Sequence, residues 1–226
     1  MNRKWAGIMV AGGLLAGAAL SYPLFFRRRC LTWGARAGEI NGPLPGDDLM
    51  PGPGTRATRA VSIGAPPSAV WPWLAQMGSG RGGAYSYDWI ENLLGLAMRS
   101  ADEILPQCQH LAVGDELPLG PEVRGLQVEI LNPERVLTVR REPTWMWTFE
   151  LTPEGDGTRL VSRNRITGPG APAWLARTLV MEPGSLVMER KMLLGIKARA
   201  ERLARARERA GSYASAGAQS AASARS

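Results

Sequence analysis

Residues 145–166 read WMWTFELTPEGDGTRLVSRNRI, two stretches of alternating side chains on either side of a Gly-Asp-Gly turn. Successive side chains of a β-strand point to opposite faces of the sheet, and glycine next to aspartate suits the tight connection of a hairpin. The segment therefore predicts two antiparallel strands at residues 145–151 and 159–166. One face of the first strand carries three large rings, those of Trp145, Trp147 and Phe149.

The second strand of this hairpin can turn either of its faces toward the core. If the face with Leu160 points inward, Ser162 and Asn164 become polar groups in an otherwise apolar lining, where such groups usually orient a ligand or bind water. If the other face points inward, Arg163 and Arg165 take that position. The sequence leaves both arrangements open.

The sequence on either side of the hairpin predicts a domain with both helices and strands. The predicted elements are, in chain order, a strand at 56–63, helices at 69–77 and 87–98, a hairpin at 126–130 and 136–140, and a long amphipathic helix that starts at Ser185. A sheet with one apolar face needs a covering layer. We therefore expect an α+β fold in which the long C-terminal helix covers a curved antiparallel sheet.

An uncharged, mostly apolar segment occupies residues 5–26. It is long enough to cross the hydrocarbon core of a bilayer as one helix, and basic residues flank both of its ends. We therefore predict that residues 1–29 form a single-pass membrane anchor, with a cleaved signal peptide as the alternative. The slight excess of arginine after the segment favours a cytoplasmic position for the rest of the chain.

Composition divides the remainder of the chain into three parts. Residues 41–54 are rich in proline and glycine, so we predict a linker at residues 30–54. Residues 211–226 consist almost entirely of glycine, alanine and serine, which predicts a disordered tail. The folded domain is accordingly expected at residues 55–210.

Charge and metal-binding residue types restrict the partners. The chain has 27 Lys and Arg against 20 Asp and Glu, a formal net charge of +7 at pH 7. Three arginines directly follow the apolar segment, so we expect a membrane partner and no nucleic acid. A single histidine, His110, and two widely separated cysteines, Cys30 and Cys108, provide no metal-binding spacing. No metal or cofactor is predicted, and the oligomeric state stays open.

A small group of acidic and phenolic side chains could carry acid–base chemistry. Its members are Tyr85, Tyr87, Asp88 and Glu91. Asp88 and Glu91 are three residues apart and share one helical face. Acids close to a helix N-terminus also serve as partners of the helix dipole, which is the alternative interpretation. The catalytic residues therefore stay unassigned.

Four strings of the sequence resemble those of a known superfamily. They are APPSAVWPWL at residues 65–74, QMG at 76–78, YSYDWIEN at 85–92 and EPGSLVMERKML at 182–193. With the order of elements, they resemble the SRPBCC superfamily of START, Bet v1-like and polyketide cyclase/dehydrase-like proteins, in particular a bacterial membrane-anchored branch. The resemblance covers about residues 55–202 and matches no catalytic motif. It implies a helix-grip fold with a deep cavity for lipids, polyketides or other apolar molecules.

The side chains expected to line this cavity are large rings, two polar groups of the hairpin and one helix methionine. They are Trp73, Tyr85, Tyr87, Trp89, Trp145, Trp147, Phe149, Ser162, Asn164 and Met192. The alternative for each ring is that it fills the core.

The expected function is that of a membrane-tethered binding or carrier module for a hydrophobic small molecule or lipid. Two alternatives make different structural predictions. A cyclase- or dehydratase-type enzyme that acts in the same cavity predicts a buried titratable pair in the pocket. A protein-interaction module predicts a filled core and an exposed apolar patch.

Overall fold

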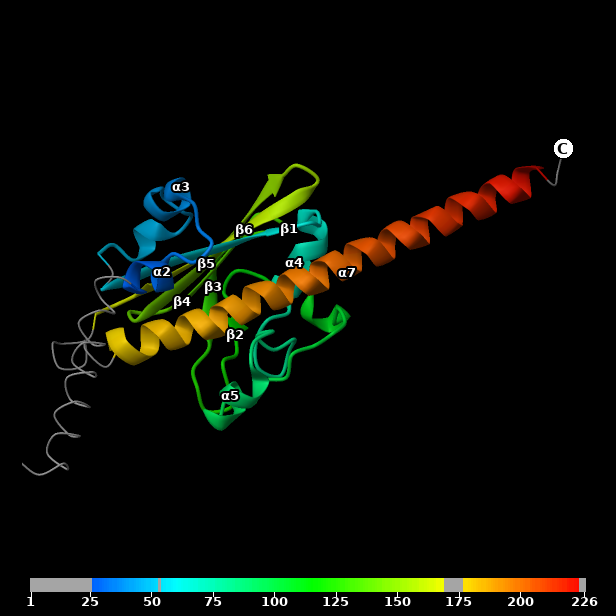
Figure 1. Ribbon diagram of the computed structural model, residues 1–226. Coiled ribbons are helices and arrows are strands. Elements are labelled where there is room, and N and C mark those ends of the chain that lie inside the picture. The colour runs from blue at the N-terminus through cyan, green and yellow to red at the C-terminus, as the bar shows by residue number, and fades with distance from the viewer. Residues whose placement is uncertain (1–25, 53, 169–176, 224–226) are drawn as a thin grey trace, which may run out of the picture.

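The computed structural model describes residues 26–52, 54–168 and 177–223. Its centre is a curved six-stranded antiparallel sheet with the strand order β1-β6-β5-β4-β3-β2 (Figure 1). The strands are β1 (Thr55–Ile63), β2 (Glu116–Leu117), β3 (Leu126–Asn132), β4 (Val136–Arg141), β5 (Trp145–Glu154) and β6 (Gly157–Ile166). One long helix, α7 (Glu182–Ser223), runs across the sheet (Figure 1). The predicted α+β layout is confirmed, and it fits the helix-grip fold.

The hairpin of β5 and β6 forms where the alternating sequence predicts it. Its register pairs Trp147 with Asn164 and Phe149 with Ser162, so the rings of one strand lie beside the polar groups of the other. Strand β1 pairs with the far side of β6 along its whole length. The first strand of the domain is therefore held by the last one.

Two short helices follow β1 in the chain, before the remaining strands. Helix α4 (Pro67–Ala75) packs against α7 and buries Trp73 and Leu74 in the core. Helix α5 (Asp88–Leu93) is shorter than the helix predicted at 87–98. Gly95 and Ala97 both have positive φ angles, +77° and +48°, and this left-handed backbone ends the helix.

Helix α7 starts at Glu182, earlier than predicted, after a π-helical turn, η4 (Arg177–Met181). Pro183 is the second residue of α7, and proline is tolerated in the first turn of an α-helix. The buried stripe of α7 includes Met192, Leu193 and Ile196. At its other end the helix continues to Ser223, into the predicted tail at 211–226, where alanine, the strongest helix former, is frequent.

Residues 30–54 do not form the predicted linker. They contain α2 (Arg27–Leu31), α3 (Ala37–Asn41) and a 3-10 turn, η2 (Asp47–Leu49), and in Figure 1 α3 lies on the side of the sheet opposite α7. Proline and glycine prevent a long helix or strand here, but they do not prevent irregular chain from packing. The sheet is therefore covered on both faces.

Acidic residues of this outer layer pair with arginines of β6. Arg159 makes two bonds to the Glu39 carboxylate, at 2.7 and 2.8 Å. The Asp47 carboxylate accepts from Arg163 at 2.5 Å and from Arg165 at 3.1 Å. These arginines point outward, so of the two open arrangements the structure has the one that turns Ser162 and Asn164 inward.

The predicted membrane span at residues 5–26 lies, apart from Phe26, outside the described residues. Within the part of the chain that the structure describes, no helix combines the length and the apolar character needed to cross a bilayer.

Candidate functional site

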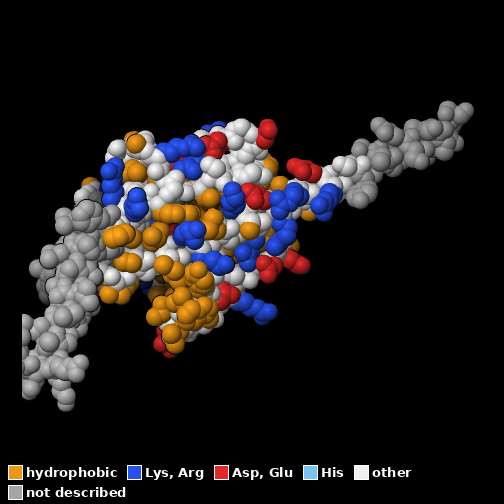
Figure 2. Space-filling model, viewed as in Figure 1, with side chains coloured by type: hydrophobic (Ala, Val, Ile, Leu, Met, Phe, Trp, Pro, Cys, Tyr) orange, Lys and Arg blue, Asp and Glu red, His pale blue; other side chains and the backbone are white. Residues whose placement is uncertain are grey.

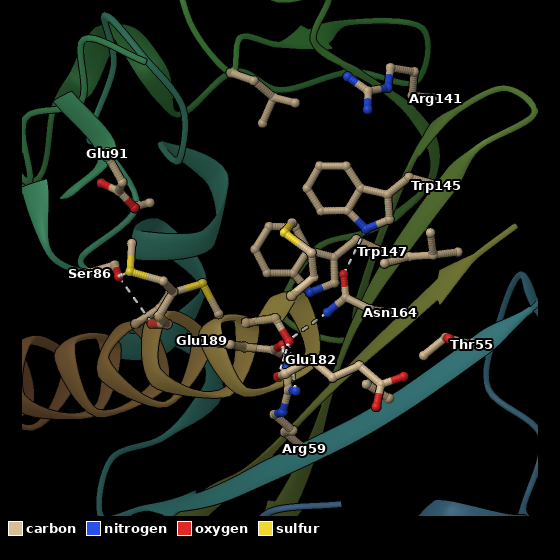
Figure 3. A pocket seen from close by; sticks show the side chains of 18 of the residues that line it. Thr55, Arg59, Ser86, Glu91, Arg141, Trp145, Trp147, Asn164, Glu182 and Glu189 are labelled. Atoms are coloured by element: carbon tan, nitrogen blue, oxygen red, sulfur yellow. Dashed lines mark hydrogen bonds and ion pairs between the residues drawn. The ribbon is translucent and has the colours of Figure 1, made fainter. Parts of the chain in front are cut away.

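A cavity of about 490 Å³ lies between the inner face of the sheet, the first turns of α7 and the segment around α5 (Figure 3). Most of the side chains that line it are apolar. They are Leu31, Ala57, Ala84, Leu96, Met98, Leu119, Trp145, Trp147, Ile166, Met181, Met188 and Met192. Methionine side chains are flexible and polarisable, so the lining can adapt to apolar molecules of different shape.

Two tryptophans form the sheet side of the cavity. The rings of Trp145 and Trp147 are stacked, with centroids 5.5 Å apart and planes 22° from parallel. Each indole N–H has a fixed acceptor: Trp145 donates to Asn164 Oδ1 at 2.7 Å, and Trp147 donates to Ser162 Oγ at 2.8 Å. Because their polar atoms are satisfied within the protein, both indoles form a fixed apolar wall.

A buried ion pair between β1 and α7 lies at the base of this wall (Figure 3). Arg59 donates to the Glu189 carboxylate, to Ser185 Oγ at 3.0 Å and to the Cys30 carbonyl at 2.9 Å. Glu189 also accepts from Ser162 at 2.7 Å and from Asn164 at 3.1 Å. The network links sheet, helix and outer layer, and it leaves neither charge without a partner.

Burial and charge act in opposite directions on Glu189. Burial raises the pKa of its carboxyl group, while the Arg59 guanidinium and the hydrogen bond from Ser162 lower it, and the balance leaves the pKa above its ordinary value. Removal of either charge would leave the other one buried without compensation. The pair therefore fastens α7 to the sheet at the inner end of the cavity.

The N-terminal end of the described chain joins the cavity near the start of α7. Arg27 binds the Glu182 carboxylate with two bonds, at 2.8 and 2.9 Å, and Glu182 lines the cavity. Leu31, at the end of α2, lines it as well. The chain that follows the apolar segment at residues 5–26 is thus attached directly to this site.

Glu91 lines the cavity from the α5 side (Figure 3). Its residue surface is 6% exposed, and its Oε2 atom is buried with no hydrogen-bond partner among the described residues. Burial, and next the charge of Asp88, raise the pKa of Glu91 to about 7. Asp88 itself accepts from the Ser100 N–H at 2.9 Å and from Ser100 Oγ at 2.6 Å, so it holds a loop in place.

Arg141 stands on the other side of the cavity, at the end of β4 (Figure 3). Its guanidinium carbon lies 5.9 Å from the centroid of the Trp145 ring. A cation over an aromatic face is held by the ring's electron density and remains able to meet water or a ligand. The cavity therefore has polar groups on both sides and an apolar surface between them.

The structure places the ten predicted cavity residues in several environments. Trp145, Trp147, Asn164 and Met192 line the cavity. Ser162 lies one layer behind the lining, where it bonds both Trp147 and Glu189.

Three of the predicted rings are in the core. The Tyr85 hydroxyl donates to the Trp73 carbonyl at 2.9 Å, and the two rings meet edge to face at 5.9 Å. Phe149 is 1% exposed and packs against Trp147 with a centroid separation of 4.7 Å. These side chains fill space under α4 and α7, the alternative considered for each ring.

The two aromatic residues at the start of α5 also lie away from the cavity. Lys191 Nζ sits 5.6 Å from the centroid of the half-buried Tyr87 ring. Trp89 is 69% exposed, because it lies on the outer side of α5 while Glu91 takes the inner side. Helical spacing predicts an α5 face here, but it does not tell which face points inward.

Sequence reasoning missed several lining residues, above all Arg59 and Glu189. Both carry a signal in the sequence. Arg59 is two residues from Ala57 and four from Ile63, so it lies on the same inward face of the strand. Glu189 precedes Met192 and Ile196 at helical spacing. A charge on each of two apolar faces that must meet indicates a buried pair.

The metal-binding residue types and the two functional alternatives can be compared with this geometry. In the described residues no cluster of His, Cys, Asp and Glu could hold a metal ion. The interaction-module alternative predicted a filled core, which the cavity contradicts, and an exposed apolar patch, which Trp89, Leu93 and Leu94 form. The enzyme alternative predicted a buried titratable pair in the pocket. The wall holds the buried ion pair of Arg59 and Glu189, whose hydrogen bonds are satisfied within the protein.

Comparisons with known proteins give similar solved structures only. No family model matches the sequence, and no curated protein matches it. A crystal structure from Mesorhizobium loti is 17% identical over 66% of this chain and 98% of that chain, with a TM-score of 0.38. One from Nitrosomonas europaea is 16% identical over 65% and 94%, with a TM-score of 0.42. A Polyketide_cyc-like protein from Corynebacterium glutamicum is 15% identical over 68% and 91%, with a TM-score of 0.33. The functional argument therefore depends on the cavity itself.

Proposed function

We propose that this protein is a membrane-tethered binding or carrier module for a hydrophobic, lipid-like or polyketide-like ligand. The observation that carries the proposal is the cavity of about 490 Å³ with its mainly apolar lining. Protein interiors are normally packed so closely that few voids exceed the size of a water molecule. A space of this size falls in the range of small-molecule sites, and its lining suits an apolar ligand.

The way the walls are built supports the same proposal. The polar atoms of Trp145 and Trp147 are bound within the protein, and the ion pair of Arg59 and Glu189 keeps helix and sheet together beside the cavity. A preformed apolar site binds without the cost of ordering its own side chains. Binding and release of an apolar molecule need no covalent chemistry from these groups.

The attachment of the chain supports a position at a membrane. Arg27 and Leu31, which follow the apolar segment at 5–26, contact or line the cavity wall. Trp89, Leu93 and Leu94 expose 69, 79 and 68% of their surface on α5 and form an apolar patch (Figure 2). Exposed apolar patches often mark membrane or protein contacts. A tether at 5–26 would hold the α5 patch and the cavity close to the bilayer.

Binding of Nile red, an uncharged apolar dye whose fluorescence rises in apolar surroundings, tests the proposal on the full-length chain. A57F should lower the affinity by about tenfold, because Ala57 lines the cavity and a phenyl ring would take up part of its volume. A198F, which places the same ring on an exposed face of α7, should leave the affinity unchanged. Failure of the wild-type chain to bind, or equal affinities of A57F and wild type, would overturn the proposal.

A cyclase- or dehydratase-type enzyme acting in the same cavity is the second candidate. Glu91 favours it, because a carboxyl group with a pKa of about 7 can give or take a proton near neutral pH. Incubation of a bound candidate ligand with fresh protein, followed by chromatography and mass spectrometry, separates the two candidates. Unchanged mass and unchanged retention time support the carrier, whereas the loss of a water molecule, or a new retention time at the same mass as for a ring closure, supports the enzyme.

A further inference from the structure

Glu91 is a buried acid whose Oε2 atom has no partner among the described residues, whereas other acids near the cavity have theirs. Its Oε2 atom is shielded from water and receives no hydrogen bond from the described residues. Asp88, on the same helix, receives two bonds from Ser100. Glu189, also in the cavity wall, is bound by Arg59. The difference therefore lies in Glu91 itself and is not a general property of acids at this site.

Burial of the Oε2 atom destabilises the folded chain, because this atom has lost its hydrogen bonds to water and gained none from the described residues. Folded proteins retain few such groups, and each one calls for a specific explanation. Burial and the charge of Asp88 raise the pKa of Glu91 to about 7, as expected for a carboxylate without a donor. The side chain also faces space that a small molecule can enter. The missing donor can therefore come from a ligand.

We propose that Glu91 accepts a hydrogen bond from the ligand, an inference that rests on the proposed function. The ligand is then an apolar molecule with a terminal donor group, a hydroxyl or a protonated amine. Above the pKa of about 7 the Glu91 carboxylate offers acceptors only, so in this form its partner must donate. A ligand carboxylate at this place would meet the charges of Glu91 and Asp88. The proposal thus excludes a fatty acid held with its carboxylate at α5.

The rest of the cavity sets the orientation of such a ligand. Glu91 belongs to the α5 side, whereas Trp145 and Trp147 form the sheet side (Figure 3). The rest of the lining is mainly apolar and includes Met98 and Met188. The donor group would point to α5, and the apolar body would extend along the two indoles.

Two isomeric probes, decanol and methyl nonyl ether, test this inference on the full-length chain. They have the same number of atoms and nearly the same apolar surface, but only the alcohol can donate a hydrogen bond. At about pH 9, where the Glu91 carboxyl is ionised and cannot donate, the wild-type chain should bind decanol about tenfold more tightly than the ether. Quenching or shift of tryptophan fluorescence measures both affinities, because two tryptophans line the cavity.

The variant E91L should bind both probes equally, with the ether affinity of the wild type retained as proof that the cavity is intact. E122L, which changes an exposed glutamate outside the cavity, should keep the preference for decanol. Equal binding of both probes by the wild type, or a preference that persists in E91L, would refute the role of Glu91 while leaving the proposed function in place. Binding of neither probe by the wild type would refute the proposed function as well.

Discussion

Glu91 and Glu189 face one cavity from different helices and differ in the hydrogen-bond donors around their carboxyl groups. Glu189 receives hydrogen bonds from Arg59, Ser162 and Asn164. Glu91 has the like charge of Asp88 nearby and no donor among the described residues. Glu189 therefore contributes to the fold, and Glu91 is available to a ligand. Burial alone therefore does not define the role of a titratable group in this cavity.

The free energy of unfolding should reveal the charge of Glu91. Because the pKa of Glu91 is raised to about 7, the folded chain binds this proton more tightly than the unfolded chain, and stability falls as pH rises through that range. E91Q carries no charge, so relative to wild type it should gain stability between about pH 5 and about pH 8, by up to about 3 kcal/mol. Urea unfolding at both pH values measures the difference. A constant difference between the two proteins would contradict the raised pKa.

At the residue level, sequence patterns identified the strand residues of the cavity better than those of the helices. Trp145, Trp147 and Asn164 follow from a period of two, which leaves only two possible faces. Around α5 the same reasoning selected Trp89, which is exposed, and left Glu91 as one of several possible acids. A short helix offers more possible orientations than a strand, and only tertiary packing selects among them.

At the level of elements, the sheet and the long helix follow from periodicity, whereas the outer layer does not. Residues 30–52 have no regular period, and their place in the fold depends on individual partners such as Glu39 and Asp47. One signal was present in the sequence. Arg163 and Arg165 alternate with residues of the inward face on a strand between two neighbours, so their charges need acids from elsewhere in the chain.

The outer layer should loosen when Asp47 is changed. D47N removes the negative charge shared by Arg163 and Arg165, which leaves two buried guanidinium groups with weaker partners and should cost about 3 kcal/mol. Chemical denaturation measures the loss, and limited proteolysis should show earlier cleavage within residues 37–52. D48N is the matched control, because Asp48 is exposed and next in the chain. Equal stability of the two variants would show that the layer does not depend on this pairing.

At the level of the whole molecule, apolar surface is exposed near the cavity and charge is concentrated elsewhere. Figure 2 shows the apolar side chains of α5 together on one face, with basic side chains along α7. Leu96 and Met98, which follow α5, line the cavity, and Trp89 faces outward from the same segment. The face that would meet a bilayer is thus continuous with the cavity wall.

Contact of α5 with lipid can be measured on the full-length chain in vesicles that contain brominated lipid, which quenches nearby tryptophan fluorescence. Trp89 is one of eight tryptophans and is exposed on the apolar patch. W89F should therefore show less quenching by brominated lipid than the wild type. W71F should retain the wild-type quenching, since Trp71 is half-buried on α4 against the core. Unchanged quenching in W89F would argue against a membrane position for α5.

The pairing of Thr55 with Ile166 has a consequence for synthesis on the ribosome. Strand β1 is translated first but finds its neighbour only when β6 has emerged, and the inner face of the sheet stays uncovered until α7 follows. The sheet and its covering helix can therefore form only after almost the entire polypeptide has been synthesised, because no short N-terminal portion contains both β1 and its partner β6. Nascent chains that end before Glu182 would expose the apolar inner face of the sheet, which chaperones and proteases recognise.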